Sequence, residues 1–110
     1  MAERYNQSEM KRSPTRDHDP VAQLTAYGPG LARRHGARRL AVFGSYARGD
    51  QTPSSDVDIL VEFEIPTFDN YMDLKFALED LLGKQVDLVV IGSLKPALRE
   101  IVMAEAKYVA

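Results

Sequence analysis

The sequence contains no cysteine. Disulfides, thiolate nucleophiles and cysteine zinc sites are therefore excluded, and any metal ion must be held by oxygen or imidazole ligands. No segment approaches the roughly 18 uninterrupted apolar residues of a membrane-spanning helix, and residues 1–20 lack the apolar stretch of a secretion signal. We therefore expect a cytoplasmic protein with one modest core, which suits 110 residues of 45% apolar composition.

Positive charge is scarce in the second part of the chain. Residues 1–39 carry 8 basic and 4 acidic side chains, whereas residues 40–110 carry 6 basic and 12 acidic ones. An acidic domain repels nucleic acid, so we expect no direct binding of duplexes, whereas local acidic clusters hold cations. Four arginines could meet an acidic partner or RNA, but at the end of a predicted helix they more simply offset its dipole: Arg33, Arg34, Arg38 and Arg39.

The beginning of the chain has no apolar periodicity. Residues 1–19 are mostly charged and small polar, which predicts a flexible N-terminal tail before a domain at residues 20–110. From residue 20 to about residue 34 apolar residues recur at helical spacing, but Gly28, Pro29 and Gly30 interrupt them. We therefore expect a helix that is broken or kinked near Tyr27.

Three short apolar runs predict strands at residues 40–43, 56–63 and 86–91. Pro66 and Thr67 should start a helix that ends at Gly83, with a buried stripe of Tyr71, Leu74, Leu78 and Leu81. Pro96 suits the first turn of a last helix, whose predicted packing face is Ala97, Ile101 and Ala104, flanked by Leu98 and Val102. The order predicts an α/β (α+β) fold: a small mixed β-sheet with helices packed mainly on one face.

Carboxylates interrupt two of these strands. Asp56 and Asp58 lie two residues apart, so the alternation of a strand aims both at one face. Asp87 stands among valines and leucine in VDLVV, a buried-looking strand in which an unpaired charge is out of place. If these strands are neighbours, three carboxylates meet and form an oxygen-only set that suits Mg²⁺ or Mn²⁺. Alternatively, Asp56 caps a loop and Asp58 lies on a solvated strand face.

Gly44 and Ser45 follow directly after the first predicted strand. A backbone without a Cβ can approach an anionic ligand there, and free amides with a hydroxyl can bind phosphate oxygens. Arg48 lies on the same segment and could meet phosphate, although a solvated loop arginine is an equal reading. We assign Gly44, Ser45, Arg48 and Ser55 as candidate nucleotide-binding residues.

These residues stand at a recognisable spacing: Gly44 and Ser45, a spacer of ten residues, then Asp56, Val57 and Asp58. The segment resembles the minimal nucleotidyltransferase family of the DNA polymerase beta superfamily, over about residues 20–105. The resemblance implies a polymerase beta-like fold in which Gly44 and Ser45 hold the nucleotide triphosphate. It further implies that Asp56 and Asp58 bind both catalytic metals, and that Asp87 ligates one metal and helps to deprotonate the acceptor hydroxyl.

Many members of that family resemble antitoxins paired with a HEPN-domain ribonuclease, to which they transfer AMP from ATP. The resemblance therefore implies an Mg²⁺- or Mn²⁺-dependent adenylyltransferase that modifies a tyrosine of a HEPN toxin. It also implies that the two proteins could form a hetero-oligomer. Two alternatives remain open. The chain could neutralise a toxin by binding alone, or it could modify a small molecule, as aminoglycoside nucleotidyltransferases do.

Overall fold

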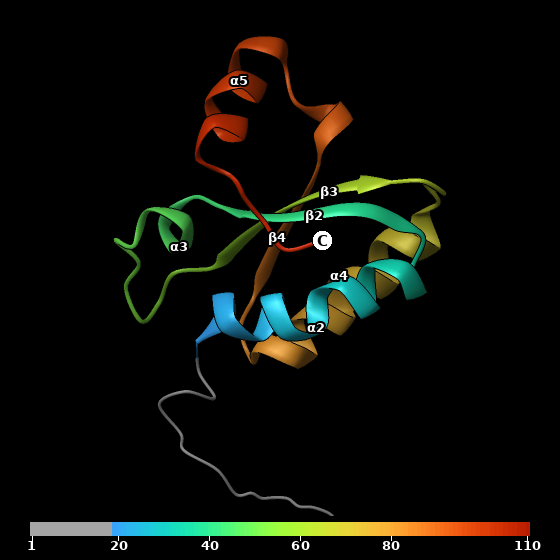
Figure 1. Ribbon diagram of the computed structural model, residues 1–110, viewed down its shortest axis with the longest axis horizontal. Coiled ribbons are helices and arrows are strands. Elements are labelled where there is room, and N and C mark those ends of the chain that lie inside the picture. The colour runs from blue at the N-terminus through green and yellow to red at the C-terminus, as the bar shows by residue number, and fades with distance from the viewer. Residues whose placement is uncertain (1–18) are drawn as a thin grey trace, which may run out of the picture.

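A computed structural model of the protein describes residues 19–110 (Figure 1). The predicted tail, residues 1–19, lies outside this part of the chain except for Asp19, whose carboxylate accepts from the Val21 amide at 3.1 Å and caps the first helix. Among residues 19–110, no helix has the length and apolar character needed to cross a membrane. The elements in chain order are α2 (Pro20–Arg34), β2 (Ala37–Phe43), α3 (Ser45–Arg48), β3 (Val57–Phe63), α4 (Phe68–Leu82), β4 (Val86–Val90), η1 (Ile91–Ser93), α5 (Pro96–Glu105) and β5 (Lys107–Tyr108).

The strands form one mixed sheet in the order β4-β3-β2-β5. Strand β2 is antiparallel to β3 and to β5, whereas β3 and β4 are parallel. Helices α2 and α4 lie together on one side of the sheet, and α5 lies on the other (Figure 1). The predicted fold class, a small mixed sheet with helices mainly on one face, is confirmed.

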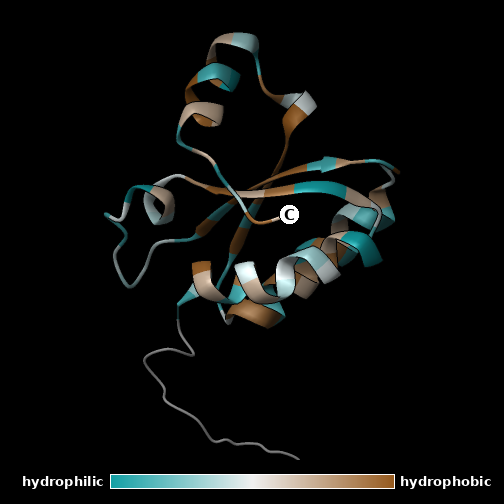
Figure 2. Ribbon diagram, viewed as in Figure 1, coloured by the Kyte–Doolittle hydropathy of each residue, from teal (hydrophilic) through white to brown (hydrophobic). Residues whose placement is uncertain are grey.

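The larger core lies between the sheet and helices α2 and α4. Strand alternation turns Val57, Ile59 and Val61 toward these helices, and all three are fully buried. The predicted stripe of α4 is confirmed: Leu74 and Leu78 are fully buried, and Tyr71 and Leu81 pack against them. Apolar residues accordingly concentrate in the central strands and recur along both helices (Figure 2). This core fixes the position of β3, which carries the Asp-Val-Asp motif.

The second core lies on the α5 side of the sheet, and among the residues that the structure describes its buried members are Ala41, Leu60 and Val102. The predicted packing face of α5 is wrong, because Ile101 is 65% exposed and Ala97, Leu98 and Ala104 are exposed as well. The helix instead turns Val102 inward. Since the sheet offers so small an apolar patch on this side, one buried residue and its partly buried neighbours are enough to hold α5.

Helix α2 is continuous, so a break near Tyr27 is wrong, whereas the alternative of a kink there stays a prediction. Pro29 lies inside the helix and costs it one backbone hydrogen bond, but tertiary packing overrides that loss. Gly28 is buried, and a Cβ there would come within 3.3 Å of Val109 and 3.5 Å of Leu40. The absence of a side chain at Gly28 therefore allows the helix to lie close to β2 and the C-terminal segment.

Several boundaries differ from those predicted. Strand β2 starts three residues earlier than expected, β3 starts one residue after Asp56, and Ile91 belongs to η1 rather than to β4. Neither α3 nor β5 was predicted. Strand β5 has only two residues and exists through its pairing with Ala41 and Val42 in β2, a long-range contact that local sequence patterns do not reveal.

Candidate active site

The turn between β2 and α3 is built around Gly44. Its φ of 72° and ψ of −148° are accessible to glycine and strained for other residues. A Cβ at this position would overlap the carboxylate of Asp58, whose Cγ would be 3.0 Å away. Glycine is therefore required twice, for the backbone conformation and for the close approach of the turn to β3.

The parallel pairing of β3 and β4 places Asp58 directly opposite Asp87. Neighbouring strands lie roughly 4.8 Å apart, so the two carboxylates leave the same face of the sheet side by side. Asp56 immediately precedes β3 and is two residues from Asp58. The structure thus brings together the three predicted carboxylates. It corrects one premise, because Asp87 is exposed on an edge strand and is not buried.

The pKa of Asp58 is shifted by the charged groups that surround it. Burial raises the pKa of Asp58 above its ordinary value, and the neighbouring Asp87 and Asp56 raise it further. Arg48 acts in the opposite direction, while Glu105 adds a fourth carboxylate that also raises the pKa. A cation placed among these groups would relieve their mutual repulsion.

The donor set fits a hard divalent cation, since the three aspartates supply only carboxylate oxygens. Within residues 19–110, however, no three His, Cys, Asp or Glu side chains already surround a point that could hold an ion. To hold a cation, the side chains of Asp56, Asp58 and Asp87 would have to turn toward it.

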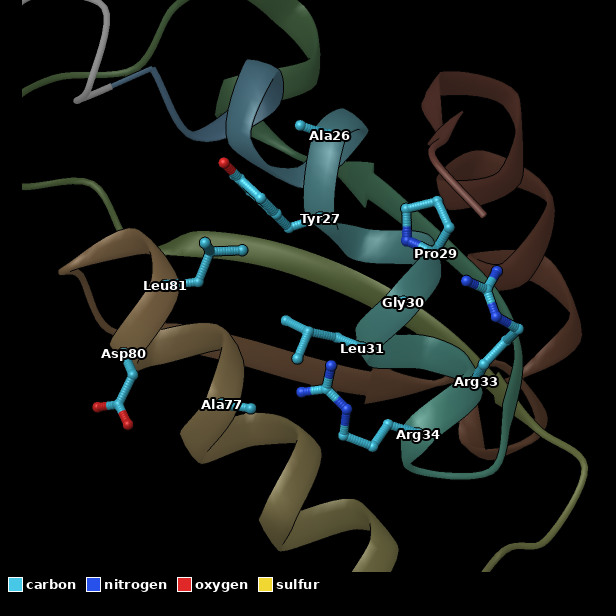
Figure 3. Close-up of a pocket in the computed structure, with 10 residues that line it drawn as sticks. All are labelled: Ala26, Tyr27, Pro29, Gly30, Leu31, Arg33, Arg34, Ala77, Asp80 and Leu81. Carbon is cyan, nitrogen blue, oxygen red and sulfur yellow. The ribbon is translucent and has the colours of Figure 1, made fainter.

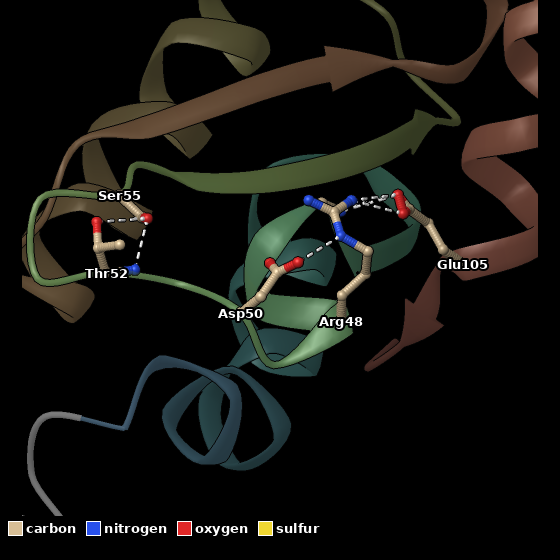
Figure 4. Close-up of polar contacts among 6 residues, drawn as sticks. Arg48, Asp50, Thr52, Ser55 and Glu105 are labelled. Atoms are coloured by element: carbon tan, nitrogen blue, oxygen red, sulfur yellow. Dashed lines mark hydrogen bonds and ion pairs between the residues drawn. The ribbon is translucent and has the colours of Figure 1, made fainter.

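Arg48 lies at the end of α3 between two carboxylates (Figure 4). Its Nε donates to Asp50 at 3.1 Å, and its Nη1 donates to both oxygens of Glu105 at 3.0 and 3.3 Å. Glu105 also accepts from the backbone amide of Gly44 at 3.3 Å. Glu105 was not predicted from the sequence, because it lies 57 residues from Arg48 and belongs to no local motif.

Ser55 lies apart from this network. Its Oγ accepts from the Thr52 amide at 2.9 Å and lies 3.2 Å from the Thr52 hydroxyl (Figure 4). These contacts shape the loop that leads into Asp56. Its predicted contact with nucleotide stays a prediction, as do those of Gly44, Ser45 and Arg48.

A separate cavity of about 550 Å³ lies between α2 and α4 (Figure 3). Tyr27, Leu31, Arg34 and Asp80 are among its lining residues. It belongs to the helix-covered side of the sheet, whereas Asp58 points to the α5 side. It contains none of the predicted site residues, so the chemistry is assigned to the carboxylates.

Comparison with known proteins agrees with this geometry. Residues 30–109 match the model of the nucleotidyltransferase domain. The chain belongs to the nucleotidyltransferase domain family. Relatives described below confirm the prediction that the chain is a minimal nucleotidyltransferase. The chain is therefore an enzyme of the nucleotidyltransferase class.

Three individual proteins are similar to this nucleotidyltransferase over most of its length. Protein adenylyltransferase MntA of Thermococcus cleftensis is 48% identical over 87 residues, which cover 78% of this chain and 88% of that protein. A structure described as a minimal nucleotidyltransferase is 44% identical with a TM-score of 0.74, over 83% of this chain and 94% of that one. A toxin-antitoxin structure with AMP-PNP is 27% identical with a TM-score of 0.67, over 78% and 72% of the two chains.

Proposed function

We propose that this nucleotidyltransferase transfers AMP from ATP to a tyrosine hydroxyl of a partner HEPN ribonuclease toxin and so acts as its antitoxin. The observation that carries the proposal is the pairing of Asp58 with Asp87 beside the Gly44 turn. It puts carboxylates for a divalent cation next to a backbone that can approach a phosphate.

The relatives support ATP as the nucleotide and a protein as the acceptor. The 48% identical relative is named a protein adenylyltransferase, and the 27% identical toxin-antitoxin structure contains AMP-PNP, an ATP analogue. Asp87 is exposed, so an acceptor carried by another protein could reach it. A tyrosine on a toxin is an acceptor of this kind, and a hetero-oligomer would hold it in place.

The reaction is a displacement at the α-phosphorus of ATP. The acceptor oxygen forms a bond to that phosphorus while the bond to the bridging oxygen of the β-phosphate breaks, so pyrophosphate leaves with the bond electrons. Asp87 accepts the hydroxyl proton, while Asp56 and Asp58 would hold the divalent cation beside the Gly44 turn. Bound Mg²⁺ or Mn²⁺ would neutralise the charge that develops on the attacking and leaving oxygens.

The test compares the parent with Asp87→Asn on a co-expressed toxin. We expect ATP to bind still, because Asp56 and Asp58 remain. Transfer should fall by ~10²–10⁴-fold, the usual cost of losing a positioned proton acceptor. Mass spectrometry of the toxin detects the AMP adduct, calorimetry measures ATP binding, and Asp73→Asn on an exposed turn of α4 is the matched control.

The same assay separates the alternatives. A toxin that is fully silenced by Asp87→Asn without an adduct would replace catalysis by simple binding. Labelled AMP on an added aminoglycoside, with none on the toxin, would assign a small-molecule acceptor. A lost adduct together with restored toxicity supports the proposal.

A further inference from the structure

Glu105 connects the last helix to the nucleotide turn. It is the final residue of α5, and its carboxylate contacts both the Gly44 amide and the Arg48 guanidinium. Its side chain is 24% exposed, compared with 52% for Arg48 and 61% for Asp50. Among the three charged side chains drawn together in Figure 4, that of Glu105 is therefore the least exposed.

A carboxylate beside a triphosphate site has two possible consequences. It could occupy the place of a phosphate oxygen and block the site, or it could hold the groups that bind phosphate. The geometry of Arg48 favours the second. Glu105 engages Nη1 and Asp50 engages Nε, so within the described part of the chain the Nη2 edge keeps its donors for another acceptor.

We propose that Glu105 is a positioning residue for nucleotide binding, which fixes Arg48 and the Gly44 turn in the orientation that receives the triphosphate. The proposal rests on the function proposed above. A free arginine side chain would lose rotamer entropy on binding phosphate, whereas a guanidinium already clamped by two carboxylates has lost it beforehand. The clamp also joins segments 57 and 61 residues apart, so α5 supports the site although none of its residues was predicted to act there.

The experiment measures ATP affinity of the full chain with Mg²⁺ by calorimetry. Glu105→Ala should weaken binding about tenfold or more, the scale of one charge-assisted hydrogen bond. Glu105→Gln should recover part of the affinity, because its amide oxygen can still accept from Arg48. Glu100→Ala, an exposed glutamate on the same helix, is the matched control and should bind like the parent.

The kinetic readout distinguishes positioning from general damage. With an acceptor in hand, Glu105→Ala should raise KM for ATP much more than it lowers kcat, and melting temperatures show whether the variant is folded. If Glu105→Ala does not fold, the Gln variant decides, since an unchanged affinity there would overturn the proposal.

Four further outcomes decide between the possibilities. Tighter ATP binding by Glu105→Ala than by the parent would show that Glu105 blocks the site. Equal ATP binding by Glu105→Ala and the parent would show that Glu105 does not position the nucleotide. A parent that binds ATP but transfers nothing defeats the proposed function while the affinities still decide the role of Glu105. A parent that binds no nucleotide overturns both.

Discussion

The two faces of the sheet differ sharply in how they are covered. Helices α2 and α4 cover one face, whereas within residues 19–110 only the short α5 and η1 lie on the other. Of the nine largest fully buried side chains in the described part of the chain, Leu60 alone belongs to the α5 side. Most of the hydrophobic stabilisation therefore comes from one face.

The proposed active site lies on the thinly covered face. Within β3, Val57 and Ile59 point into the large core, while Asp58 between them points to the α5 side. One strand thus anchors the fold through alternate residues and presents a carboxylate through the others. Substitutions on the acidic face should therefore change nucleotide binding and transfer, whereas substitutions in the large core should change stability.

The sharpest test of this separation is Asp58→Asn. Transfer should fall by at least ~10²–10⁴-fold, and ATP binding should weaken as well, because a carboxylate needed for the cation is lost. The melting temperature without metal should stay equal or rise, since Asp56, Asp87 and Glu105 all repel the Asp58 carboxylate. Calorimetry and thermal unfolding measure both effects. A large drop in melting temperature would mean that the two faces are not separable.

The next test compares the two cores. Leu78→Ala in α4 should lower the free energy of unfolding by ~2–5 kcal/mol, because Leu78 is fully buried. Val102→Ala in α5 should cost only about 1–2 kcal/mol, from the loss of two methyl groups in a smaller core. Urea unfolding of both variants gives the two values. Equal losses would show that α5 contributes as much as the helices opposite.

The sequence predicted what depends on local patterns. The alternation around Asp56 and Asp58, and the helical spacing of Leu74 and Leu78, follow from backbone geometry and survive in the structure. The predicted break near Tyr27 was wrong because local rules do not include tertiary packing, and here Gly28 lies close to Leu40 and Val109.

The candidate site was likewise predictable only in part. The neighbourhood of Asp58 and Asp87 required that β3 and β4 pair, which the sequence allowed but did not dictate. Glu105 could not be predicted from the sequence, because it contacts the site only through the way the end of α5 returns to the Gly44 turn. The exposure of Ile101 was missed for a related reason, since the apolar pattern of a helix does not state which of its faces finds a partner.

The smallest expected effect is a change in stability on substitution of Glu79. This residue lies on α4 and connects that helix to the start of β4, the strand that carries Asp87. It accepts from Lys75 at 2.8 Å and from the Val86 amide at 3.1 Å, one residue before Asp87. The hydrogen bond from Lys75, followed by that from Val86, lowers the pKa of Glu79 below its ordinary 4.5. Because the folded pKa is the lower one, this stabilisation is complete above about pH 4.5 and is lost as the pH falls through the folded value.

Glu79→Gln should therefore be less stable than the parent at pH 7, and the difference should shrink as the pH falls below about 4.5. Urea midpoints of both proteins between pH 7 and pH 3 provide the measurement. In a Lys75→Met background the pH-dependent part should be smaller, because the largest cause of the lowered pKa is gone. A gap that stays constant over the whole range would contradict the assignment. Transfer at pH 7 should change little, since Glu79 holds the start of β4 from the helix side while Asp87 keeps its pairing with Asp58.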